Sequence, residues 1–126
     1  MILIGTKLQV SDNSGAKIIE CIKILGKPSF SFASIGDIIV VSVKELSAKN
    51  KQNRKVEKGG IYKALITETK KGIKRKDGSI IKFNRNAALL LSEQGNPLGT
   101  RILGTLTYEL RKKNQTKVLS LASRVL

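Results

Sequence analysis

Six short segments that favour β-strands constrain the fold of this chain most strongly, because turn residues separate each from the next. In the longest, residues 37–46, five of the ten side chains are β-branched Ile or Val. Such side chains pack well on a pleated sheet. Short strands with frequent turns are typical of a small closed antiparallel barrel, so the sequence predicts a mainly β protein. The six segments are residues 7–10, 17–25, 37–46, 61–69, 79–83 and 87–91.

The last quarter of the chain has a different pattern. After a turn at residues 96–99, Leu106 and Leu110 lie four residues apart, as on one face of a helix. The polar residues 114–116 separate this segment from a second helical one that contains Val118. Helices this short are unstable alone, so we expect them to pack on the barrel. The predicted organisation is one domain of residues 1–126, with a barrel and basic hairpin arms in 1–95 and a loop with short α-helices in 96–126.

The charge of the chain points to a polyanionic partner. Twenty-four Lys and Arg residues outnumber nine Asp and Glu residues, which gives a formal net charge of +15. Self-repulsion at that charge opposes a compact state, and nucleic acid would relieve it. Two loops concentrate the charge: residues 49–58, interpreted as a long hairpin arm, and residues 70–78, with bends at Gly72 and Asp77-Gly78. For the arm at residues 49–58, the alternative is a solvated loop with a chance excess of lysine.

Several residue types needed for catalysis are scarce. The chain has no histidine, its acidic residues are scattered, and no Gly-Lys-Ser/Thr phosphate loop is present. The single cysteine, Cys21, lies in an apolar run and is predicted to be a buried free thiol. We therefore expect no enzyme, no metal and no cofactor. No apolar run approaches the roughly 20 residues of a membrane span, so we expect no membrane partner.

Aromatic residues are few: three Phe, two Tyr and no Trp. Proteins that bind single-stranded RNA use aromatic platforms, so the composition favours folded RNA recognised through its shape and backbone. Phe30 and Phe32 have the alternate spacing of a small platform, but anchoring in the core or a loop is favoured. The rival functions are a free RNA chaperone of the cold-shock kind and a peripheral membrane binder.

The chain resembles the universal large-subunit ribosomal protein fourteen family in its bacterial and organellar branch, almost from end to end. The longest matching stretch is TKKGIKRKDGSIIKFNRNA at residues 69–87. The other matching stretches are VSDNSGA at 10–16, CIKILG at 21–26, GDII at 36–39, KE at 44–45, PLGTRI at 97–102, ELR at 109–111, SLA at 120–122 and VL at 125–126.

The resemblance implies a five-stranded barrel that binds large-subunit ribosomal RNA on the face toward the small subunit. It also implies contacts with small-subunit RNA, with neighbouring ribosomal proteins and with a ribosome-silencing factor, and no homo-oligomer. The RNA-binding residues expected are Asn13, Ser14, Lys17, Lys23, Lys44, Lys49, Lys51, Arg54, Lys55, Lys70, Lys71, Lys74, Arg75, Lys76 and Arg85. Those expected at the inter-subunit and protein interface are Thr100, Arg101, Arg111 and Lys117.

Some positions depart from the family pattern. The arm at residues 49–58 is a few residues longer and lacks the usual proline, and Leu89 replaces a frequent valine. Glu68 stands where a basic residue is common, and Arg85 stands where glycine is frequent. The chain begins where mature family members begin and is rich in Lys, Ile, Asn and Ser, as AT-rich coding would give. We therefore expect an organelle-encoded protein of the mitochondrion, with the bacterial cytoplasm as the alternative.

Overall fold

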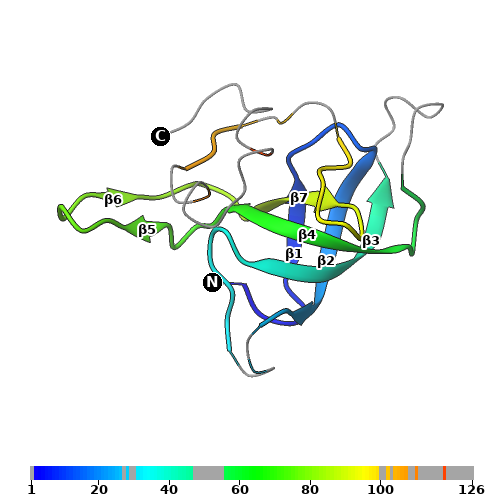
Figure 1. Ribbon diagram of the computed structural model, residues 1–126, viewed down its shortest axis with the longest axis horizontal. Coiled ribbons are helices and arrows are strands. Elements are labelled where there is room, and N and C mark those ends of the chain that lie inside the picture. The colour runs from blue at the N-terminus through cyan, green and yellow to red at the C-terminus, as the bar shows by residue number, and fades with distance from the viewer. Residues whose placement is uncertain are drawn as a thin grey trace.

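Five strands close into a barrel in the computed structural model, in the order β1-β2-β3-β4-β7 (Figure 1). The structure describes residues 2–26, 28, 31–46, 56–99, 102, 104–107, 110 and 118. The barrel strands are β1 (Lys7–Val10), β2 (Ala16–Ile24), β3 (Ile38–Leu46), β4 (Ile61–Glu68) and β7 (Ala87–Leu91). Two further strands, β5 (Ile73–Lys74) and β6 (Ile80–Ile81), form a separate two-stranded sheet. The prediction of a mainly β protein with a closed five-stranded barrel is confirmed.

The pair of strands that closes the barrel is parallel, whereas the sequence predicted antiparallel pairing throughout. Strand β1 pairs with β7 in parallel, with Gln9 opposite Ala87 and Val10 opposite Ala88. The other four pairs are antiparallel. The reason is geometric, because strand directions cannot alternate all the way around a ring with an odd number of strands. The closing pair therefore places the beginnings of β1 and β7 at the same end of the barrel.

The predicted strand over residues 79–83 is not part of the barrel. Only Ile80–Ile81 are extended there, and they pair with Ile73–Lys74 in a hairpin that projects away from the barrel (Figure 1). Strand β7 pairs with β4 instead, and all five of its side chains are buried. A wholly apolar strand gains more from that buried position than the mixed segment 79–83, in which Ile80 remains 56% exposed.

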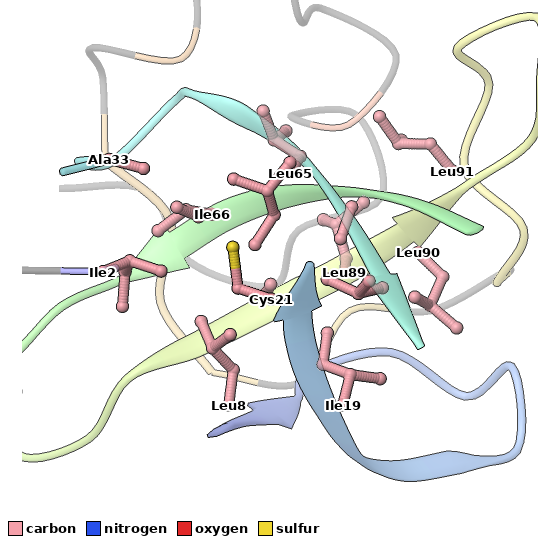
Figure 2. Packing of buried hydrophobic residues seen from close by; sticks show 14 of the residues in the cluster. Ile2, Leu8, Ile19, Cys21, Ala33, Leu65, Ile66, Leu89, Leu90 and Leu91 are labelled. Carbon is pink, nitrogen blue, oxygen red and sulfur yellow. The ribbon is translucent and has the colours of Figure 1, made fainter. Parts of the chain in front are cut away.

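One hydrophobic cluster fills the barrel and the space beside it. Figure 2 shows side chains from several strands converging, among them Leu8, Ile19, Leu65 and Leu89, which are all at most 1% exposed. Cys21 lies in the same cluster, and burial raises the pKa of its thiol. The prediction of a buried free cysteine is confirmed.

The C-terminal part of the chain contributes to this core. Ile102 pairs with Asp12 through an isolated bridge, and Leu106, Leu110 and Val118 are buried in the same cluster as the barrel residues. Leu110 and Val118 have helical backbone, but most of the two predicted helices lies outside the described residues. Within the described part of the chain, no helix is long and apolar enough to cross a membrane.

Candidate nucleic-acid interface

The β5–β6 hairpin holds the basic segment 70–78 in a defined shape. At its tip, the amide of Arg75 donates to the carbonyl oxygen of Ser79 at 2.8 Å, and the amide of Gly78 donates to the carbonyl oxygen of Arg75 at 3.1 Å. The Asp77 carboxylate accepts from the Ser79 hydroxyl at 2.6 Å and from the Ser79 amide at 3.0 Å. These hydrogen bonds lower the pKa of Asp77, which therefore stays ionised at neutral pH.

The base of the hairpin requires glycine at position 72. Gly72 has φ +75, and a Cβ at this residue would overlap the carbonyl oxygen of Ile81 on the opposite side of the hairpin. The Gly72 amide also donates to the hydroxyl of Thr69 at 3.0 Å. The sharp bend turns the chain out of β4, so that Lys70 and Lys71 lie at the root of the hairpin and Lys74 and Lys76 lie on it, all of them exposed.

A polar hollow of about 240 Å³ lies beside the base of the hairpin. The Lys70 amide donates to the Asn86 side-chain oxygen at 2.9 Å, which ties this end of β4 to the start of β7. Lys7, which was not among the predicted RNA-binding residues, joins Lys70 here because β1 and β7 run in parallel. No local sequence pattern signals that long-range pairing. The hollow is lined by Lys7, Leu8, Gln9, Ile18, Lys70, Asn84, Arg85 and Asn86.

Glu68, the last residue of β4, forms an ion pair with Arg85, which lies just before β7. The Arg85 Nε donates to a Glu68 carboxylate oxygen at 2.6 Å, and the Glu68 side chain is 6% exposed. A second guanidinium nitrogen donates to the side-chain oxygen of Gln9 at 3.2 Å. The other Glu68 oxygen accepts from the Thr105 amide at 3.4 Å. Arg85 is 30% exposed, so its guanidinium group both neutralises a buried carboxylate and reaches the rim of the polar hollow.

The turn between β1 and β2 lies at the opposite end of the barrel from the hairpin. Asp12, 7% exposed, accepts from the Ser14 hydroxyl at 2.6 Å, the Ser14 amide at 3.1 Å and the Leu90 amide at 3.0 Å. Ser14 is fully buried, so its hydroxyl fixes the turn, whereas Asn13 is exposed. Gly99 is close to the turn, since a Cβ there would lie 2.8 Å from the Asn13 side-chain oxygen.

The other predicted site residues lie either on the barrel wall or outside the part of the chain that the structure describes. Lys17 and Lys23 are exposed on β2, and Lys44 on β3 forms an ion pair with Glu20 at 3.5 Å. The hairpin carries one more exposed basic residue, Lys82, which was not predicted because it lies outside the 70–78 charge run. The predicted site residues outside the described part of the chain are Lys49, Lys51, Arg54, Lys55, Thr100, Arg101, Arg111 and Lys117.

The described residues do not form a metal site. Among the described residues, no group of three or more Cys, Asp or Glu side chains is arranged to hold a metal ion, and the chain has no histidine. The exposed cations of the hairpin, and those around the polar hollow at its base, therefore form the most distinctive chemical feature in the described structure.

Comparison with protein families agrees with the fold. The family described as ribosomal protein L14p/L23e matches residues 1–126, which is the full length of the chain. The match includes the hairpin, the turn after β1 and the residues that close the barrel. The chain therefore belongs to the ribosomal protein L14p/L23e family, whose members are proteins of the large ribosomal subunit.

Proposed function

We propose that this protein binds large-subunit ribosomal RNA through the β5–β6 hairpin and the polar hollow at its base. The observation that carries the proposal is the fixed placement of Lys70, Lys71, Lys74 and Lys76 on a hairpin with a hydrogen-bonded tip and an obligatory glycine at its root. Cations held on a rigid scaffold meet defined phosphates and release counterions when they bind. This mode of binding requires no catalytic group, and we propose no enzymatic activity.

The wider proposal follows the family. The protein would act as one domain, as a single copy in the large subunit, where it contacts neighbouring ribosomal proteins. Asn13, at the end of the barrel opposite the hairpin, and the basic residues Lys49, Lys51, Arg54 and Lys55 would add RNA contacts. Thr100, Arg101, Arg111 and Lys117 would face small-subunit RNA and a ribosome-silencing factor. We propose the mitochondrial ribosome as the location, with the bacterial ribosome as the alternative.

Neutralising the hairpin is expected to weaken RNA binding and to reduce its salt dependence. In a variant with Lys74→Gln, Arg75→Gln and Lys76→Gln, the slope of log affinity against log salt should fall by about one unit per lost phosphate contact. The measurement is a titration of a large-subunit RNA transcript at several salt concentrations. Lys63→Gln, at an exposed position on β4, is the control and should change the slope little.

The assembled particle provides the second readout. The tagged wild-type protein should sediment with the large subunit and remain there after a high-salt wash, whereas the triple variant should dissociate at lower salt. If the wild-type protein sediments alone or with small RNA, it acts as a free RNA chaperone instead. An unchanged salt slope in the triple variant would show that these three residues do not contact phosphate.

A further inference from the structure

An exposed aromatic ring lies beside the cations at the root of the hairpin. The sequence predicted that Phe32 anchors a loop or the core, but 45% of this residue is exposed. The Lys71 ammonium nitrogen is 5.1 Å from the centre of the Phe32 ring, within the range of a cation–π interaction. An aromatic face and a cation, taken from segments 39 residues apart in sequence, therefore share one small area of surface.

The backbone that follows this ring in sequence is held in place. Next to Phe32, Ala33 is fully buried and exchanges two backbone hydrogen bonds with Ile2, at 2.7 and 3.2 Å. The Ser34 amide donates to the Asp37 carboxylate at 2.8 Å, and the Gly36 amide donates to the carbonyl oxygen of Ile66 on β4 at 2.9 Å. Residues 33–37 are thus tied to β4 near the point from which the hairpin departs, so a ligand would need to order this part of the loop little.

The ring borders a hollow of about 190 Å³ between the loop and the hairpin. One wall comes from the loop and the other from the chain as it leaves β4, where Gly72 makes its sharp bend. None of the described residues that line it carries a carboxylate. The lining residues are Phe32, Ala33, Ser34, Thr69, Lys71 and Gly72.

We propose that this hollow, which we call the Phe32 site, receives one unpaired nucleotide of the RNA bound by the hairpin. The base would stack on the exposed part of the Phe32 ring, and its phosphate would pair with the ammonium group of Lys71. Every base has a π-face, so stacking of this kind tolerates any base at the site. The cation favours RNA over an apolar side chain of a neighbouring protein, which would gain nothing from it. The inference rests on the proposed function, because it needs RNA at the hairpin.

The absence of tryptophan from the chain makes the site directly measurable. In a Phe32→Trp variant the only indole would lie at the Phe32 site, and adding a large-subunit RNA transcript should quench its fluorescence through stacking. Ile4→Trp is the matched control, because Ile4 is 46% exposed, much as Phe32 is, and lines neither of the two hollows. Its fluorescence should change little on the same titration.

Truncation of the ring provides the second measurement. Phe32→Ala should weaken binding of the transcript by about tenfold, which is in the lower part of the range for the loss of one stacked base. The salt slope should stay unchanged, because the substitution removes no charge. Ile4→Ala should bind like the wild-type protein. Circular dichroism of each variant would verify that the barrel is intact.

The outcomes separate this inference from the proposed function. If the transcript binds with a normal salt slope while the Phe32→Trp fluorescence and the Phe32→Ala affinity stay unchanged, the stacking site is wrong and RNA binding by the hairpin stands. If the fluorescence responds to neighbouring ribosomal proteins and not to RNA, the site is a protein contact and the inference is overturned. If neither the wild-type protein nor any of the variants binds the transcript, the proposed function itself is wrong.

Discussion

Asp12→Ala is expected to lower the free energy of unfolding by about 3–5 kcal/mol, because it removes a buried acceptor from three hydrogen bonds. The donors are the Leu90 amide and the amide and hydroxyl of Ser14, all in buried surroundings. Because these donors are buried, water cannot readily replace the carboxylate as their acceptor. Urea denaturation followed by circular dichroism would measure the loss.

The hairpin supplies a control for that measurement. Asp77 accepts the same pair of hydrogen bonds from the residue two positions on, Ser79, at 2.6 and 3.0 Å. Asp77 is exposed, so water can take its place, and Asp77→Ala should destabilise the protein far less. Asp12→Asn should fall between wild type and Asp12→Ala, since its amide keeps one acceptor oxygen. If Asp12→Ala and Asp77→Ala lowered the free energy of unfolding equally, burial would not strengthen the hydrogen bonds of the turn between β1 and β2.

Arg85→Ala is expected to lower the free energy of unfolding by about 2 kcal/mol, because it leaves the Glu68 carboxylate buried without its counter-charge. Breaking a fully buried pair costs about 3–5 kcal/mol, and the 30% exposure of Arg85 reduces that figure through solvent screening. Thermal and urea unfolding of the single variants, and of the double variant with Glu68→Gln, would give the coupling energy of the pair.

A paired substitution tests the same pair from the other direction. The double variant Glu68→Gln with Arg85→Gly removes both charges of the pair at once. It should be more stable than Arg85→Gly alone, because it leaves no unpaired buried carboxylate. Additive effects of Glu68→Gln and Arg85→Ala, with a coupling energy near zero, would contradict the claim that the 2.6 Å contact stabilises the fold.

The strands of the barrel could be predicted because their signal is local. β-Branched residues dominate segments such as 38–43, and turn residues separate those segments, so no long-range information is needed. The hairpin was harder, because residues 79–83 satisfy the same local criteria as a barrel strand. Residues 79–83 and residues 87–91 compete for the position beside β4. The fully apolar segment 87–91, which forms β7, occupies that position.

The residues of the candidate site also fall into two groups: those that the sequence reveals and those that depend on tertiary packing. The charge of residues 70–76 is visible in sequence, so most of the hairpin cations were predicted. The inclusion of Lys7 depends on the parallel pairing of β1 with β7, and the Glu68–Arg85 contact joins residues 17 positions apart around the hairpin. The position of Phe32 depends on how its loop docks on β4. Each of these features arises from tertiary packing, which composition and periodicity do not encode.

The parallel closure of the barrel also bears on how such a protein can diversify. Because β1 and β7 start at one end, the hairpin, Lys7 and the Glu68–Arg85 pair share that end, whereas the Asp12 turn and Gly99 share the other. The barrel core separates the two groups of loops, and a charge exchanged at one end can be compensated by a neighbour at the same end. Glu68 and Arg85 form an ion pair within one such group, so this architecture allows a charge change at one end of the barrel to be balanced there without altering the loops at the other end.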